Sequence, residues 1–287
     1  MPDSLHTART EIPTDRFVTL AIGRRSATIT LSRPKLNPIN DDLLNQLDEA
    51  LAELESHPEL SVVRIRSDQR AFSAGADLEI VQARLGTDAG AQEMMETSRR
   101  FHRVYDRLAS LPAVTIAQIG GHAMGGGLEL ALACDLRIAA RQAKLGLPET
   151  RVGLLPGAGG TQRLTQLCGP GIAARLILTC ELVDGAEAHR IGLVQWVYDA
   201  AELDAATDAL VSAISTLSAP ALLHAKQCIG HATAMSAAGV RAEVEGIGEL
   251  MKTEEARQLI GGFLGKQRPA ARDRSPSDAP TGDMARE

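Results

Sequence analysis

The most constraining feature of the sequence is a strand, a glycine turn and a helix that follow one another between residues 114 and 133. The apolar run Val114–Ile119 predicts a strand. Three glycines at 125–127 come next, and residues 128–133 predict a helix. Glycines let backbone N–H groups turn toward a bound group, and a helix start favours negative charge. The segment therefore predicts a donor-lined pocket, with the Glu129 carboxylate in the first helical turn behind it.

The remaining chain alternates predicted strands and helices and then becomes helical throughout. Strands at 17–22 and 27–31 precede a helix that Asn40 caps, and its leucines recur at helical spacing. This alternation indicates the α/β class. The pattern divides the chain into a flexible arm at 1–14, a core at 15–215, a helical region at 216–268 and a disordered, charged tail at 269–287.

Charge and composition exclude several classes of protein. The net charge of −6 argues against general nucleic-acid binding. No stretch is long and apolar enough to span a bilayer, so we expect no membrane partner. The four cysteines stand singly, in neither a metal-ligand nor a disulfide pattern, which favours reduced thiols. We therefore expect a cytoplasmic protein that binds no metal, with mitochondrial import left open.

Two glutamates beside turns are the candidate catalytic groups. A glutamate is most often a surface charge or a helix cap, but Glu129 stands among apolar residues, where a carboxylate needs a partner or a function. Glu149 follows Pro148 at a turn. Two carboxylates that face each other can pass protons to and from a bound water.

Two further glycine segments have less specific patterns. The glycines at 157–160 open a helix but lack the Gly-Lys-Ser/Thr ending of a phosphate-binding loop, which favours a packing and turn role. Small residues surround Gly75, so the backbone there either approaches another group or forms a tight packing turn. That segment alone favours the packing turn.

The motifs together resemble the crotonase superfamily, and specifically its enoyl-CoA hydratases, over residues 17–268. The resemblance rests on three segments in this order and spacing, Ala71-Phe72-Ser73-Ala74-Gly75-Ala76-Asp77-Leu78, Gly125-Gly126-Gly127-Leu128-Glu129-Leu130 and Leu147-Pro148-Glu149 with Pro156-Gly157-Ala158-Gly159-Gly160-Thr161-Gln162. It implies an α/β fold, a spiral of ββα units, with a C-terminal helical region that mediates trimers or dimers of trimers.

The resemblance also assigns roles to individual residues. Ala76 and Gly126 match the positions whose N–H groups form the oxyanion hole around a thioester carbonyl. Glu129 matches the glutamate that activates water, and Glu149 the one that supplies or removes the α-carbon proton. The residues that match substrate-binding positions are Ala74, Asp77, Leu78, Phe263 and Lys266.

The implied activity is reversible syn addition of water to a trans-2-enoyl-CoA, giving a 3-hydroxyacyl-CoA. The resemblance implies no metal or redox cofactor, and coenzyme A is part of the substrate. The nearest alternatives are double-bond isomerisation and dehydration of another hydroxyacyl-CoA, such as a carnitinyl one. A nicotinamide-dependent dehydrogenase is disfavoured, since residues 125–127 are not a spaced Gly-x-Gly-x-x-Gly. A non-catalytic CoA-ester-binding protein fits poorly with both glutamates.

Four positions leave details open. A loop histidine such as His122 is more often structural than catalytic. Lys35 lies in a segment about one residue shorter than the family's usual form, so the resemblance does not assign it as a phosphate contact. Met94 and Met95 either line a pocket or fill the core, and the acyl-chain preference cannot be read from them.

Overall fold

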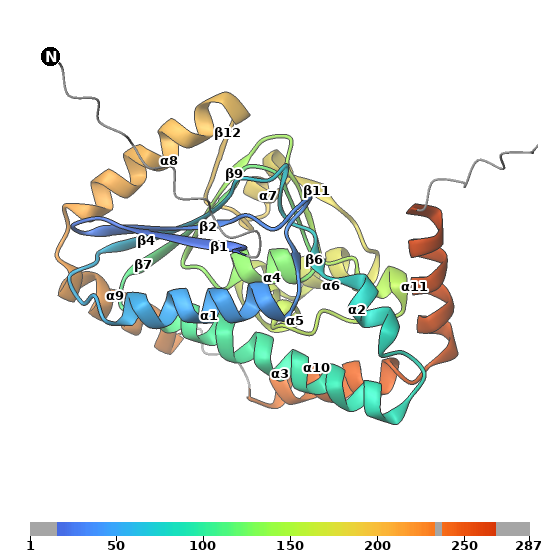
Figure 1. Ribbon diagram of the computed structural model, residues 1–287. Helices are drawn as coiled ribbons and strands as arrows, with labels where there is room; N and C mark the ends of the chain where they lie inside the picture. Colours follow the sequence, from blue (N-terminus) through green and yellow to red (C-terminus); the bar gives the residue numbers. More distant parts are fainter. Residues whose placement is uncertain (1–15, 233–236, 268–287) are drawn as a thin grey trace, which may run out of the picture.

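The computed structural model describes residues 16–232 and 237–267 (Figure 1). The predicted arm at 1–14 and the predicted tail at 269–287 lie outside the described residues. Within the described part, strands and helices alternate up to about residue 200 and helices follow, as the sequence predicts.

Two sheets form the centre of the described part of the chain. The larger sheet has the strand order β1-β2-β4-β7-β9-β12, and all its neighbours are parallel except β1 and β2. The smaller sheet has the order β11-β10-β8-β5, with only β10 and β11 antiparallel, and β3 pairs separately with β6. The strands of the larger sheet are β1 (Val18–Ile22), β2 (Ser26–Leu31), β4 (Val62–Ser67), β7 (Val114–Ile119), β9 (Leu136–Ala140) and β12 (Trp196–Tyr198). The others are β3 (Pro38–Ile39), β5 (Ala71–Ser73), β6 (Gly75–Ala76), β8 (His122–Met124), β10 (Lys144–Gly146) and β11 (Val183–Asp184).

Successive turns of the chain each add one strand to each of the two sheets. Strand β4 leads to β5, β7 to β8 and β9 to β10, and the members of each set are neighbours in their own sheet. Helices α3 (Asp88–Ser110), α4 (Gly126–Leu132) and α5 (Gly160–Cys168) follow these strand pairs. This order is the spiral of ββα units that the resemblance implies, so the predicted fold class is confirmed.

Local sequence explains the first amphipathic helix of the chain. Helix α1 (Asp41–Glu55) begins where the Leu43 amide donates to Asn40 Oδ1 over 3.0 Å. Its leucines then bury one face against the sheet, where Leu43, Leu47 and Leu51 are at most 1% exposed. Burial of these side chains supplies the main stabilisation of the helix, as the sequence pattern predicts.

Helix α4 lies at the middle of the molecule, and all seven of its residues are buried (Figure 1). The helix begins at Gly126, two residues earlier than the apolar pattern predicts, and the short strand β8 precedes it. Sequence periodicity misses β8 because three residues are too few to show alternation. A Cβ at Gly127 would lie 2.5 Å from the Ser73 carbonyl oxygen, so glycine lets α4 pack directly on β5.

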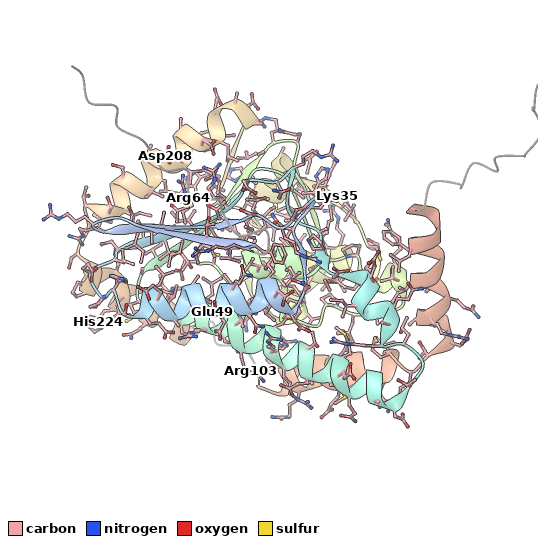
Figure 2. All side chains as sticks on the ribbon, viewed as in Figure 1. Lys35, Glu49, Arg64, Arg103, Asp208 and His224 are labelled. Carbon is pink, nitrogen blue, oxygen red and sulfur yellow. The ribbon has the colours of Figure 1, made fainter. Side chains whose placement is uncertain are left out.

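The C-terminal helices pack on the larger sheet and on the helices of the spiral. Helix α8 (Ala200–Ser215) packs on the larger sheet, where Arg64 of β4 pairs with Asp208 over 2.6 Å (Figure 2). Helix α10 (Ala237–Leu250) packs along α3, and α11 (Glu254–Gln267) packs against α2 and the 3₁₀ turn η1 (Glu149–Val152). The other helices are α2 (Leu78–Ala83), α6 (Pro170–Leu178), α7 (Gly185–Arg190) and α9 (Ala219–Ala232). The division of the chain at 215/216 coincides with the end of α8, and an independent helical region stays a prediction.

None of the described helices is by itself long and apolar enough to cross a bilayer. Helix α8 and residues 219–230 of α9 satisfy the length and composition criteria only as a pair, bent by 104° at the break between them.

Candidate active site

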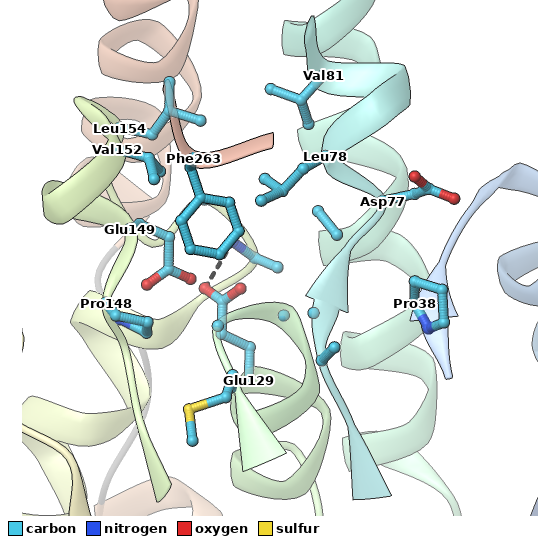
Figure 3. Close-up of a pocket in the computed structure, with 18 of the residues that line it drawn as sticks. Pro38, Asp77, Leu78, Val81, Glu129, Pro148, Glu149, Val152, Leu154 and Phe263 are labelled. Atoms are coloured by element: carbon cyan, nitrogen blue, oxygen red, sulfur yellow. Dashed lines mark hydrogen bonds between the residues drawn. The ribbon is translucent and has the colours of Figure 1, made fainter. Parts of the chain in front are cut away.

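A cavity of about 710 Å³ opens between the spiral and the C-terminal helices. Its walls come from β6 and α2 on one side, from η1 on the other, and from α3, α4, α10 and α11. Both candidate glutamates line it, and Figure 3 shows their carboxylates extending into the same space. The structure therefore brings together the two groups that the sequence singled out.

Glu129 is held by backbone amides of the second glycine segment. Its side chain is only 2% exposed, and Oε1 accepts hydrogen bonds from the Ala158 and Gly160 amides, each over 2.8 Å. A buried carboxylate is tolerated where hydrogen bonds replace its hydration. The prediction of a packing role for residues 157–160 was therefore incomplete, because these residues also fix the position of a carboxylate about thirty positions earlier in the chain.

Glu149 reaches the cavity from the half-buried turn η1. Its carboxylate lies so close to Gly125 that a Cβ there would be 2.7 Å from Oε1. The turn is anchored below, since Thr150 Oγ1 donates to the Ile177 carbonyl over 2.9 Å and Arg151 donates to the Cys180 carbonyl over 3.1 Å. Gly125 has a φ of 50°, which glycine adopts without strain and which lets the chain turn before α4. Because it has no Cβ, Gly125 also leaves space for the Glu149 carboxylate.

The backbone amides of Ala76 and Gly126 lie close together beside these carboxylates. A Cβ on Gly126 would be 3.5 Å from the Ala76 nitrogen, and one on Gly75 would be 3.1 Å from the Gly126 nitrogen. Gly126 is the first residue of α4, where an N–H has no acceptor within the helix. The Asp77 amide donates to the Ile39 carbonyl in β3. Because successive amides of a strand point in opposite directions, the preceding Ala76 amide points away from β3. The small residues around Gly75 thus serve a close backbone approach.

The predicted substrate-contacting residues of the β6–α2 segment, Ala74, Asp77 and Leu78, all line the cavity. The Asp77 carboxylate pairs with Arg33 over 2.9 Å and accepts from the Glu79 amide, capping α2. Figure 3 shows it turned away from the two glutamates. Asp77 therefore holds the β6–α2 segment in place, while Leu78 supplies apolar wall.

Phe263 comes to the cavity from α11 of the same chain. Its ring, 40% exposed, stands between Glu149 and Leu78 in Figure 3. Lys266 belongs to the same helix, but its side chain lies outside the described residues. Lys35 is exposed and lines the cavity.

His122 has a structural role, as predicted. Its Nδ1 accepts a hydrogen bond from the Lys144 amide over 3.0 Å and so joins β8 to β10. Since Nδ1 is the acceptor, the neutral ring carries its proton on Nε2. The described residues that line the cavity do not include it.

Tyr105 contacts the first residue of α4, next to the cavity, and sequence analysis did not identify it. Its fully buried hydroxyl donates to the Gly126 carbonyl over 2.9 Å, and its ring meets Phe101 edge to face. Burial, and then the nearby Glu129 charge, raise the pKa of Tyr105 well above its usual value, so the hydroxyl stays a donor. Because Tyr105 lies among the apolar residues of α3, the sequence predicts only a core position for it.

The described residues contain no group of three or more His, Cys, Asp or Glu side chains placed to hold a metal ion. Besides apolar side chains, the cavity lining includes the Glu129 and Glu149 carboxylates and the charged residues Lys35 and Arg151.

Comparisons with known proteins give a consistent result. Residues 23–274 match the family model for enoyl-CoA hydratase/isomerase. The probable enoyl-CoA hydratase echA8 of Mycobacterium bovis is 37% identical over 248 residues, which cover 86% of this chain and 94% of that protein. The short-chain-enoyl-CoA hydratase of Clostridium acetobutylicum is 35% identical over 249 residues, 84% of this chain and 92% of that protein. A crystal structure of an enoyl-CoA hydratase from Mycobacterium avium subsp. paratuberculosis K-10 superposes with a TM-score of 0.77 at 27% identity, over 85% of this chain and 98% of that one.

Proposed function

Because this chain belongs to the enoyl-CoA hydratase/isomerase family, we propose that it adds water reversibly, in the syn sense, to a trans-2-enoyl-CoA, giving a 3-hydroxyacyl-CoA. The observation that carries the proposal is the meeting of Glu129 and Glu149 in one cavity, next to two closely spaced amides. Related proteins named as enoyl-CoA hydratases support the same chemistry.

The amides of Ala76 and Gly126 act on the thioester oxygen. When water adds at the β carbon, the electron pair of the double bond moves toward the carbonyl and the oxygen gains negative charge. Two fixed N–H donors stabilise that charge, and the loss of one such donor typically costs about 10²–10³ in rate. Because the amides belong to segments that pack on each other, their spacing is set before the substrate arrives.

The glutamates carry the two proton transfers. Glu129 accepts a proton from the attacking water, while its Oε1 is held by the Ala158 and Gly160 amides. Glu149, protonated, gives a proton to the α carbon, and the water oxygen bonds to the β carbon. Because both carboxylates lie on one side of the bound thioester, the two new bonds form on the same face of the double bond.

Isomerisation of a β,γ double bond is the alternative reaction, since the family description covers isomerases as well. Isomerisation needs one carboxylate to move a proton, whereas hydration uses both. The presence of two glutamates in the cavity therefore favours hydration.

The activity is tested by the ultraviolet absorbance of the conjugated thioester. We expect the absorbance of crotonyl-CoA to fall as water adds, and a β,γ-enoyl-CoA to be converted much more slowly. Rapid gain of absorbance from the β,γ ester, without loss from crotonyl-CoA, would instead establish an isomerase. No change with either ester, together with NADH binding, would establish a dehydrogenase-type protein.

We also propose that the chain assembles into trimers or dimers of trimers. Apolar side chains stand exposed on α5 and α6, with Leu167 at 38% and Leu178 at 73%, and in the C-terminal helical region, with Leu217 at 48%. Light scattering coupled to size-exclusion chromatography is expected to give three or six times the mass of one chain. Leu178→Glu is expected to shift the mass downward, and a wild-type mass of one chain would contradict the proposal.

A further inference from the structure

The cavity has two chemically different ends. One part is lined by exposed charged residues, Lys35, Glu79 and Arg151. The other end is apolar and closed, since Met94 and Phe101 of α3 and Ile247 of α10 line it while each is at most 6% exposed. A thioester whose anionic end lies beside Lys35 and Arg151 can extend its acyl chain to these buried residues, Ile247 among them.

Helix α10 reaches this end because glycines bring it unusually close to its neighbours. A Cβ at Gly248 would lie 2.4 Å from the Met95 sulfur, and one at Gly246 would lie 2.8 Å from Leu155 Cδ2. These two glycines flank Ile247 on the helix. Helix α10 lies along α3 (Figure 1). The Ile247 side chain lines the cavity and lies beside Gly157.

Ile247 packs beside Gly157, and the residue after Gly157 holds the Glu129 carboxylate. Its Cδ1 would be 2.7 Å from a Cβ on Gly157, whose carbonyl accepts a hydrogen bond from Ser98 over 2.5 Å. The next residue, Ala158, donates to Glu129 Oε1. Ile247 therefore lies beside the segment that holds Glu129, and both residues line the same cavity.

From this geometry, and resting on the proposed hydratase function, we propose that Ile247 is the wall that limits acyl-chain length. The substrate class that fits is a short-chain enoyl-CoA, whose acyl group ends before the isoleucine side chain. Longer chains must displace Ile247, which is 4% exposed and packs beside Gly157.

The test is the ratio of kcat/KM for trans-2-decenoyl-CoA to that for crotonyl-CoA. Ile247→Ala removes three carbons from the wall, so we expect the ratio to rise about tenfold or more, since each methylene that a pocket accommodates is worth about tenfold or more in discrimination. Ile247→Val removes one carbon and is expected to raise the ratio less, in the same direction. It keeps the test valid if the alanine variant folds poorly.

Val244→Ala is the matched control. Val244 is also on α10 and is 6% exposed, but it is not among the described residues that line the cavity. Its ratio is expected to stay at the wild-type value even if its melting temperature falls. Wild-type hydration of crotonyl-CoA with unchanged ratios in both Ile247 variants would overturn the wall assignment alone. A wild-type protein that hydrates neither ester would overturn the proposed function as well.

Discussion

The two glutamates reach one cavity from supports of different construction. Glu129 stands on α4, whose residues are all buried and whose apolar side chains belong to the main core. Two amides fix its carboxylate. Glu149 stands on η1, a four-residue turn none of whose described side chains is fully buried. The turn is fixed by polar contacts to the end of α6 and by packing against α11.

The difference indicates which parts of the chain set each carboxylate. Glu129 depends on the spiral itself, and its position should survive changes in the C-terminal helices. Glu149 depends on a smaller apolar cluster that joins α2, α3, α10 and α11 to residue 154, so changes there should move it. Four predictions test this contrast, from the largest expected effect to the smallest.

Gly160→Ala should have the largest effect, because it acts on the Glu129 support. The added Cβ would lie 2.8 Å from Glu129 Oε1 and 2.9 Å from Pro156 Cβ. We expect kcat for crotonyl-CoA hydration to fall about a hundredfold or more, the usual range for a misplaced general base. Gly171→Ala, in α6 with nothing within 4 Å of its Cβ, is the control that should keep wild-type kcat. Equal kcat values for both variants would show that the position of the Glu129 carboxylate against the Ala158 and Gly160 amides does not affect turnover.

Gly153→Ala probes the Glu149 support. A Cβ there would lie 2.9 Å from the Ala256 Cα, so α11 must move away from η1. We expect stability to fall by about 1–3 kcal/mol and kcat/KM to fall about tenfold, less than for Gly160→Ala. Gly192→Ala has nearly the same φ, 79° against 76°, but nothing within 4 Å, and so carries the backbone strain alone. If both variants lose the same activity, α11 packing does not position Glu149.

Tyr105→Phe tests the buried centre through one hydroxyl. Loss of the bond to the Gly126 carbonyl should lower the free energy of unfolding by about 1 kcal/mol and slow turnover only modestly. Urea denaturation and kcat measure the two effects. Tyr198→Phe, at a half-buried position in β12, should leave both near wild type. A Tyr105→Phe variant as stable as wild type would contradict the assigned bond.

The smallest effect concerns Cys134, next to the end of α4. Burial raises the pKa of the Cys134 thiol from 9.0 to about 12. The unfolded chain therefore ionises this thiol first, so its stability contribution is complete below about pH 9 and is lost as the pH rises toward 12. Between pH 8 and about pH 9 we expect stability to fall by a few tenths of a kcal/mol more in wild type than in Cys134→Ala. Identical pH profiles of unfolding in the two proteins would contradict the buried, neutral thiol.

The α/β class and both candidate glutamates could be predicted because local patterns indicate them, whereas the spiral of ββα units was implied by the resemblance to the crotonase superfamily. Asn40 caps α1 as expected, and the strand at Val114–Ile119 and the buried Glu129 follow from apolar runs and glycine turns. These signals are contained within ten or so neighbouring residues, which a single sequence displays directly.

The supports of the glutamates could not be predicted because they depend on contacts between distant segments. Nothing near Glu129 indicates that the amides of Ala158 and Gly160 would reach its carboxylate. Tyr105 was indistinguishable from a core residue of α3, and Ile247 lies more than a hundred residues from Glu129. Contacts between such distant residues depend on how segments pack in three dimensions, and the periodicity of a single sequence does not predict that packing.

The central claim is that Glu129 and Glu149 act as one pair over the same thioester. The most direct measurement is the rate of crotonyl-CoA hydration by Glu129→Gln, Glu149→Gln and the double variant, with CoA-ester binding measured by calorimetry. We expect each single variant to lose about a hundredfold or more, the double variant to be about as slow as the slower single one, and ester binding to survive. Wild-type turnover in either single variant, or losses that multiply in the double variant, would contradict the account.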